Sequence, residues 1–262
     1  MDASINNVVP FPTRRPQVRT VIKVAQHTGT RPFLCYASDE NHYWCKIFHG
    51  PHGWEGILNE IVASVIGEQI NAPVRPWTIL DIPESLVSTQ VGEGTQRYRL
   101  PDAPVFASLA LHTADVTDQL SDINRDGNYD RVPLLIALWY LCNADDLQVL
   151  YDDDADRQIW SIDHGLWFGS QEIPWHLAPM TEWAGRPSIP RIPTTIPPVH
   201  WDRAINAVDN LSVDVAETIT RLLPEAWAVP PEVPARLVRY ACERKESTKE
   251  KLRELRNRTE RR

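Results

Sequence analysis

Two aspartates, Asp145 and Asp163, border a short predicted hairpin, and this arrangement constrains the fold more than any other feature of the sequence. Residues 148–151 and 159–162 are rich in strand-forming side chains, and the polar run between them supplies turn residues. A strand that ends in an aspartate and is soon followed by a glycine, here Gly165, suits a metal site, because the strand fixes the carboxylate and glycine allows a sharp turn. The alternative for each aspartate is an ordinary turn. As a pair they predict two functional carboxylates beside one hairpin.

The first hundred residues predict a small lobe dominated by strands. Residues 33–37 and 42–48 are β-rich and are joined by the turn sequence Ser-Asp-Glu-Asn, which predicts a hairpin. Residues 56–70 place aliphatic side chains at helical spacing, and Asn71-Ala-Pro ends that helix. Further short strands are expected at 21–24, 77–82, 87–91 and 105–111. These six short segments and one helix are the inventory of a small lobe dominated by its sheet.

Helices are expected from residue 115 onward. The clearest covers residues 132–142, is apolar on nearly every side and is therefore expected to be buried. Five prolines between residues 187 and 198 exclude a helix there, because proline fixes φ and lacks a backbone donor. Two further helices are expected at 201–207 and 213–222. The predicted division is a flexible leader at 1–19, an N-terminal lobe at 20–111, a helical C-terminal lobe with the hairpin at 112–238, and a basic charged helix or tail at 239–262.

The charge distribution excludes a general nucleic-acid binder. The chain of 262 residues carries a net charge of −8, whereas affinity for phosphate backbones comes from clustered lysine and arginine. The segment from Arg239 to Arg262 departs from this average, with ten basic residues against five glutamates. Its charges alternate at helical spacing, which predicts a solvated helix with ion pairs or, alternatively, a surface that docks onto an acidic partner.

The sequence predicts a cytoplasmic protein without membrane association. No apolar run is long enough to cross a bilayer, and the N-terminus lacks the pattern of a secretion signal. The four cysteines, Cys35, Cys45, Cys142 and Cys242, lack the paired spacing of a zinc site and lie in apolar segments. We expect free thiols that behave as small hydrophobic residues.

A lysine and a glutamate stand at unusual places in the small lobe. Lys46 lies in the middle of an otherwise apolar strand, where an unpaired ammonium is costly to bury. Glu60 lies in the following helix among aliphatic residues. Taken alone, each has an ordinary interpretation, as an edge-strand lysine that reaches solvent and as an exposed helix glutamate. Together they match the strand lysine and helix glutamate that orient the phosphates of a nucleotide in kinases.

The two aspartates complete the same chemistry. Phosphoryl transfer needs positive charge on the phosphates, a carboxylate that holds magnesium, and a second carboxylate beside the attacking hydroxyl. Asp145 follows a buried helix, where a catalytic base would lie, and Asp163 ends a strand, where a metal ligand would lie. The order Lys46, Glu60, Asp145, Asp163 is the order of these parts in kinases.

Several motifs resemble the HipA-like kinase family, in particular its compact bacterial members, over residues 21 to about 255. The motifs are Thr28-Gly-Thr-Arg-Pro-Phe-Leu, His42-Tyr-Trp-Cys-Lys-Ile-Phe, Leu58-Asn-Glu, Trp139-Tyr-Leu-Cys-Asn-Ala-Asp and Ile162-Asp-His-Gly. They are similar to that family's nucleotide-covering hairpin, lysine strand, Asn-Glu helix, catalytic segment and metal-binding motif, in that order. Several motifs in order are far more specific than any one of them.

The resemblance implies an α+β, two-lobed, protein-kinase-like fold and the cofactors ATP and Mg²⁺. It implies that Lys46, Glu60 and Asp145 are catalytic and that Asp163 holds metal. It also implies that Gly29 and Thr30 cover the nucleotide, and it places the adenine hinge around residues 106–109, so that Phe106 and Ser108 contact the base. The implied activity is phosphorylation of serine or threonine in a protein substrate, with the chain itself as a candidate. Because some relatives act in toxin–antitoxin systems, an antitoxin or regulatory protein is a further candidate partner.

One departure from the family pattern leaves two function classes open. The family places an asparagine that holds the second metal five residues after its catalytic aspartate, and here that position is Leu150. A loop two residues shorter brings Gln148 to that place and aligns the following strand, so we assign Gln148 as the second metal ligand. Asp146 also stands where the family often has arginine. The alternatives are therefore an active kinase and a pseudokinase that binds nucleotide or a protein partner without turnover.

A calcium site is a weaker alternative elsewhere in the chain. Residues 122–130 match the start of an EF-hand loop, but the position of the bidentate glutamate is Pro133. We interpret this segment as a polar loop ahead of the buried helix.

Overall fold

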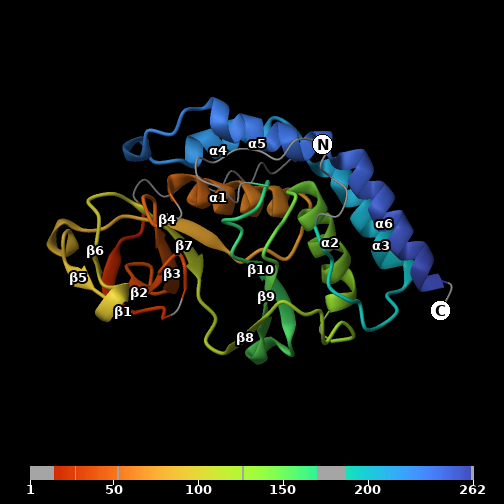
Figure 1. Cartoon of the computed structure of the whole chain (residues 1–262), viewed down its shortest axis with the longest axis horizontal. Helices are drawn as coiled ribbons and strands as arrows, with labels where there is room; N and C mark the ends of the chain where they lie inside the picture. Colours follow the sequence, from red (N-terminus) through yellow and green to blue (C-terminus); the bar gives the residue numbers. More distant parts are fainter. Residues whose placement is uncertain (1–14, 27, 52, 126, 170–186, 261–262) are drawn as a thin grey trace, which may run out of the picture.

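Strands gather in the first half of the chain and helices in the second half (Figure 1). The computed structural model describes residues 15–260 apart from residues 27, 52, 126 and 170–186. The strands are β1 (Val18–Val24), β2 (Phe33–Ala37), β3 (His42–Ile47), β4 (Trp77–Leu80), β5 (Gln90–Val91), β6 (Tyr98–Arg99), β7 (Val105–Leu109), β8 (Ala114–Thr117), β9 (Gln148–Asp152) and β10 (Gln158–Ile162). The α-helices are α1 (Gly53–Gln69), α2 (Asn128–Leu141), α3 (Pro198–Ala207), α4 (Val215–Leu222), α5 (Glu232–Glu243) and α6 (Lys245–Glu260). The chain thus has the predicted α+β arrangement, with a small lobe rich in strands followed by a mainly helical part.

The small lobe is built on a five-stranded antiparallel sheet with the order β1-β2-β3-β7-β4. The predicted β2–β3 hairpin is confirmed, with Phe33 opposite Cys45. Alternation along β3 sends Tyr43 and Cys45 into a hydrophobic cluster on one face of the sheet. Trp44 and Lys46 occupy the other face of β3, which lines a cavity. Because β3 is the middle strand of this sheet, the edge-strand interpretation of its lysine is wrong.

Helix α1 is buried on nearly all sides. It begins at Gly53, earlier than predicted, and twelve of its residues are buried, including Asn59 and Glu60. A helix that is apolar all round must be enclosed by other elements, and α1 packs against α2, α4 and α5 (Figure 1). At Gly67 a Cβ atom would collide with a methyl group of Val74, so glycine is required for this close packing. The helix that carries Glu60 is therefore rigidly placed.

A second, three-stranded sheet with the order β10-β9-β8 lies in the C-terminal half. The predicted hairpin is confirmed as β9 and β10, with Gln148 opposite Ile162. The expectation of helices directly from residue 115 is wrong, because β8 pairs with β9 and turns the hairpin into a sheet. A parallel bridge between Val74 and Ser161 ties this sheet to the loop between α1 and β4, and so joins the two lobes.

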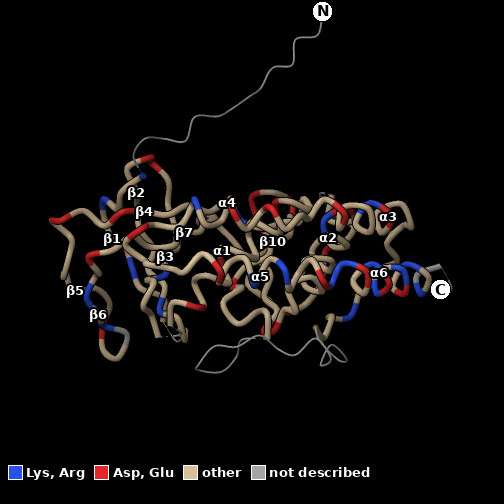
Figure 2. The backbone as a smooth tube through the Cα atoms, turned by 90° about the horizontal axis from the view of Figure 1, so that it is seen from above, with Lys and Arg blue, Asp and Glu red and all other residues tan. Residues whose placement is uncertain are grey.

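The C-terminal segment is a packed part of the molecule. Helix α5 was not predicted, and it extends past the expected start of the tail at Arg239. Helix α6 buries Leu252 and packs against α2 and α3. Figure 2 shows acidic and basic residues alternating along α6, which confirms the expected charged helix. The helix is not merely solvated, because Thr248 and Lys249 are also buried.

The N-terminal boundary also differs from the prediction. The leader was expected to extend to residue 19, but β1 begins at Val18, and Gln17 forms a bridge with Asp81. Residues 1–14 of the predicted leader lie outside the described residues. Within the described part of the chain, no helix combines the length and the apolar character needed to cross a lipid bilayer.

Candidate active site

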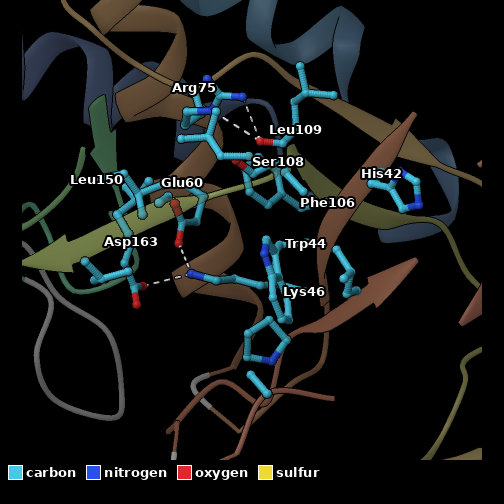
Figure 3. A pocket seen from close by; sticks show the side chains of 18 of the residues that line it. His42, Trp44, Lys46, Glu60, Arg75, Phe106, Ser108, Leu109, Leu150 and Asp163 are labelled. Carbon is cyan, nitrogen blue, oxygen red and sulfur yellow. Dashed lines mark hydrogen bonds and ion pairs between the residues drawn. The ribbon is translucent and has the colours of Figure 1, made fainter. Parts of the chain in front are cut away.

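A cavity of about 980 Å³ separates the five-stranded sheet from the β8–β10 sheet (Figure 3). One wall comes from β3, β7 and α1, and the other from β8, β9 and β10. The polar lining residues include Lys46, Glu60, Ser108, Gln148 and Asp163. A concave, mostly apolar space with a few convergent polar groups is typical of a small-molecule site.

Lys46 is the electrostatic centre of this cavity. Its ammonium group forms ion pairs with Glu60 and, at 2.8 Å, with Asp163 (Figure 3). Burial alone would lower the pKa of Lys46, but the charges of the two carboxylates more than reverse this effect, so its pKa lies above the ordinary value. The lysine is therefore cationic. Two carboxylates face one ammonium, which leaves one excess negative charge in the group.

Glu60 connects Lys46 to the chain segment that follows Asp163. One carboxylate oxygen of Glu60 pairs with the lysine, and the other accepts a hydrogen bond of 3.0 Å from the backbone N–H of His164. The glutamate side chain is only 4% exposed, so its exposed-helix interpretation is wrong. Three groups predicted from the sequence, Lys46, Glu60 and Asp163, are thus brought together from β3, α1 and the end of β10.

Asp163 has a backbone conformation that is unusual for an aspartate. Its φ is 57°, in the left-handed region, whereas Gly165 does not have a positive φ. The sharp turn predicted at Gly165 therefore occurs at Asp163 itself. Such a conformation costs on the order of 1–2 kcal/mol for a residue with a Cβ and tends to persist at functional sites. In this conformation the Asp163 carboxylate lies 2.8 Å from the Lys46 ammonium group.

The histidine after Asp163 is held on three sides. Its Nε2 lies 2.9 Å from the Ser161 hydroxyl oxygen, and its ring packs on Trp167 at a centroid distance of 4.3 Å. Burial lowers the pKa of His164, so the imidazole is neutral at neutral pH. Its backbone N–H is bound by Glu60. These contacts of His164 therefore fix the chain segment that follows Asp163, and its neutral ring adds no charge to the cavity.

Asn59 is a positioning residue that sequence reasoning did not identify, although it stands in the quoted Leu58-Asn-Glu motif. Its side chain is fully buried and donates to the carbonyl oxygens of Gly165 at 2.9 Å and Trp167 at 3.2 Å. We expect Asn59→Ala to lower the free energy of unfolding by about 2 kcal/mol, because both carbonyls lose their buried donor. Urea denaturation measures this change. Asn210→Ala, at an exposed position, is the control and should change stability by less than about 0.5 kcal/mol.

The structure places Gln148 and Leu150, the two positions considered for the second metal ligand, at different distances from the strand end that carries Asp163. Gln148 lies opposite Ile162 on the paired strands and lines the cavity, next to the strand end that carries Asp163. Leu150 also lines the cavity, but it lies opposite Trp160, two residues further from that end. This placement favours Gln148 over Leu150 as a ligand beside Asp163. The Gln148 amide nitrogen donates to Asp146 at 3.2 Å, whereas a metal would bind the amide oxygen.

Asp145 lies in the loop between α2 and β9 and is not among the cavity-lining residues. It is half-buried, and its carboxylate accepts a hydrogen bond of 2.9 Å from the backbone N–H of Asp146. Two residues of this loop, Asn143 and Asp146, have positive φ angles of 46° and 50°. The loop is thus tightly turned, and its aspartate lies three residues before Gln148.

The predicted nucleotide contacts are partly brought together. Phe106 and Ser108 on β7 line the cavity, and Phe106 pairs directly with Lys46 across β3 and β7. Thr30 lines a small pocket on the other side of Lys46 and Glu60. Gly29 is exposed and lines neither space, whereas its neighbour Thr28 lines the large cavity.

Arg75 is a second residue that the sequence did not reveal. Its guanidinium donates through Nε and Nη2 to the carbonyl oxygen of Leu109, at 3.2 and 3.1 Å (Figure 3). It also lies over the Trp160 ring at 4.6 Å. Arg75 therefore ties the end of β7 to β10, on the other side of the cavity. Its partners are a backbone carbonyl and a ring far away in sequence, so no local pattern could indicate the contact.

The donor set fits magnesium bound through phosphates better than a complete protein cage. Carboxylate and amide oxygens, as offered by Asp163 and Gln148, are the hard ligands that Mg²⁺ prefers. Among the residues that the structure describes, no three His, Cys, Asp or Glu side chains are arranged to hold a metal ion. Magnesium is commonly held by one or two protein ligands together with substrate phosphates, which agrees with this arrangement.

The calcium alternative receives no support from the loop at 122–130. The Asp122 carboxylate accepts hydrogen bonds from Ser121 and from Arg157 at 3.2 Å, and it lies 3.7 Å from Arg125. Pro133, at the position of the bidentate ligand, lies inside α2. The described part of this loop is therefore a polar loop stabilised by arginines.

Comparison of the sequence with models of protein families identifies the family of the chain. The sequence model of the HipA-like kinases matches residues 18–173, more than half of the chain. The chain belongs to the HipA-like kinase family.

Similar solved structures include two of a Golgi casein kinase. The first has 10% identity and a TM-score of 0.48, and covers 92% of this chain and 72% of that one. The second, with Mn/ADP bound, has 11% identity and a TM-score of 0.46, and covers 92% and 73%. No curated protein matches the chain.

Proposed function

We propose that the chain is an ATP-dependent kinase that transfers the γ-phosphate of ATP to a serine or threonine of a protein, with the chain itself as a candidate substrate. The observation that carries this proposal is the placement of Lys46 between Glu60 and Asp163 in one cavity. A positive group held by a helix glutamate beside a strand-end aspartate is the arrangement that binds triphosphates in kinases. Membership of the HipA-like kinase family supports the same conclusion.

Each residue has a defined part in the proposed reaction. Lys46, oriented by Glu60, binds phosphate oxygens and stabilises their charge. Asp163 and Gln148 are the residues that would hold Mg²⁺, which when bound neutralises the phosphate charge. Asp145 takes the proton from the attacking hydroxyl, whose oxygen forms the new bond to phosphorus as the bond to the ADP oxygen breaks.

We expect Asp145→Asn to lower the rate of phosphate transfer about 10²-fold, at the low end of the range for a general base. The substitution removes the proton acceptor but keeps the shape of the side chain. Labelled ATP with the purified protein, and with a generic Ser/Thr protein substrate, measures the transfer. Asp154→Asn, an exposed change in the turn between β9 and β10, is the control. Equal labelling of wild type and Asp145→Asn would show that Asp145 is not the base.

A second candidate, a pseudokinase, is favoured by the hydrophobic Leu150 at the usual ligand position and by the place of Asp145 outside the cavity lining. Such a protein binds nucleotide and acts through its surface, toward a regulatory protein partner for example. Its signature is thermal stabilisation by ATP and Mg²⁺, by mass action, without turnover. Measured transfer to any substrate excludes it.

A further inference from the structure

The end of α2 leads directly into the loop that carries Asp145. The Ala144 N–H donates to the Trp139 carbonyl at 2.9 Å, so the chain stays folded onto the helix for one more turn. Asn143, only 1% exposed, has a φ of 46° and turns the chain away from the helix axis. Asparagine tolerates this left-handed conformation better than most residues. The placement of Asp145 therefore depends on how this helix end is fixed.

Arg244, at the junction of α5 and α6, fixes it. Its side chain is among the largest that are fully buried, with an exposure of 2%. Its Nε donates to the Tyr140 carbonyl at 2.7 Å, and its Nη2 donates to the Asn143 side-chain oxygen at 3.3 Å. The guanidinium also lies 5.4 Å from the centre of the Tyr240 ring. One planar side chain thus holds both the last turn of α2 and the first residue of the loop.

Physical chemistry explains why an arginine suits this place. The last carbonyls of a helix have no partner within the helix and carry partial negative charge, so a cation that donates to them is favourable. The guanidinium has donors in a fixed fork, and two acceptors at a fixed spacing match that fork. A lysine carries the same charge but lacks the planar fork.

The contact spans about a hundred residues of sequence, and Arg244 itself lies outside the part of the chain that the family match covers, residues 18–173. Lys46, Glu60 and Asp163 are held by β3, α1 and the end of β10, and none of them contacts Arg244 through a described hydrogen bond or ion pair. A change at Arg244 should therefore act on Asp145 and spare the phosphate-binding group.

We propose that Arg244 is a positioning residue for Asp145, so that the α5–α6 junction sets the geometry of the proton-accepting loop. This inference rests on the proposed kinase function for its catalytic consequence, but not for the contact itself. Small displacements of a catalytic group cost large factors in rate. Arg244→Lys should lower kcat about tenfold and leave the KM for ATP within about twofold.

The test combines kinetics with amide hydrogen exchange of the whole chain. In Arg244→Lys and Arg244→Met, exchange should speed up in peptides that cover residues 141–147, where the Ala144 amide lies, and stay unchanged in α1 and β3. Arg239→Met, an exposed change on α5, is the matched control and should match wild type in exchange and in kcat. If Arg244→Met does not fold, the exchange and the kcat of Arg244→Lys test the proposal.

A third variant changes the partner of Arg244 in the same contact, Asn143. Asn143→Gly removes the side-chain acceptor of Arg244 and keeps the left-handed backbone free of strain. The double variant Asn143→Gly/Arg244→Lys should have a kcat no lower than that of the more impaired single variant, because both changes remove the same contact. Wild-type exchange in residues 141–147 of the Arg244 variants, or a loss of ATP affinity as large as the loss of kcat, overturns the proposal. If wild type transfers no phosphate at all, the kinase function fails, and the exchange result alone still decides whether Arg244 holds the loop.

Discussion

Asp163→Asn should abolish most phosphate transfer, with a fall of about 10³-fold in kcat. A neutral amide cannot hold a divalent cation as a carboxylate does, and the loss of one such group in a preorganised site costs about 4 kcal/mol of transition-state stabilisation. The substitution keeps the size of the side chain, and Lys46 keeps its ion pair with Glu60. The folded structure should therefore survive. Steady-state transfer from labelled ATP at saturating magnesium measures the change.

The control separates the loss of a metal ligand from the loss of any negative charge. Asp102→Asn alters an exposed aspartate in the loop before β7 and should leave kcat unchanged. In Asp163→Asn, thermal stabilisation by ADP should lose its dependence on magnesium. A variant that keeps wild-type kcat and magnesium dependence would show that the metal binds elsewhere and would remove the basis for assigning Asp163.

The central group of Lys46, Glu60 and Asp163 could be predicted because it includes charged residues that stand in otherwise apolar stretches of sequence. Lys46 interrupts an apolar strand, and Glu60 interrupts an apolar helix that is buried on nearly all sides. A charged residue in such a place must find a partner of opposite charge. The order of such residues along the chain then matched that of a kinase. The structure brings Lys46, Glu60 and Asp163 together, whereas Asp145 is not among the residues that line the cavity.

The residues that hold the chain segments around the cavity could not be predicted, because their partners are backbone atoms far away in sequence. Asn59, Arg75 and Arg244 donate to carbonyl oxygens of the segment after Asp163, of β7 and of α2. Every residue has such a carbonyl group, so no particular pair of residue types in the sequence indicates the contact. Strand β8 was missed for a related reason. It is short and largely exposed, with no apolar alternation to indicate its pairing with β9.

The positive φ of Asp163 shows a second limit on what the sequence could predict. The glycine two residues later is the usual sequence signal for a left-handed turn, yet the turn lies at the aspartate. Tertiary contacts explain the difference, since Glu60 binds the N–H of His164 and Asn59 binds the carbonyl of Gly165. Contacts from α1 to the two residues that follow Asp163 determine where the turn occurs, and the local sequence does not contain them.

Lys46→Met should destabilise the protein by about 3–5 kcal/mol and also eliminate phosphate transfer. The methionine fills similar space, but Glu60 and Asp163 lose the ammonium between them, and Glu60 is left as a buried carboxylate without its cation. Removal of one partner from a buried ion pair has an effect of this size. Urea denaturation measures the free energy of unfolding, and labelled ATP measures the transfer.

Two further variants distinguish the electrostatic cause from a packing cause. Lys251→Met removes a lysine from the exposed pair with Glu254 and should cost less than about 1 kcal/mol, because solvent screens such pairs. Lys46→Met combined with Glu60→Gln makes both buried groups neutral and keeps an acceptor for the His164 N–H, so most of the stability should return. Transfer should stay absent, because no cation remains to bind the phosphates. A double variant as unstable as the single one would mean that packing, and not the buried charge, sets the stability of this site.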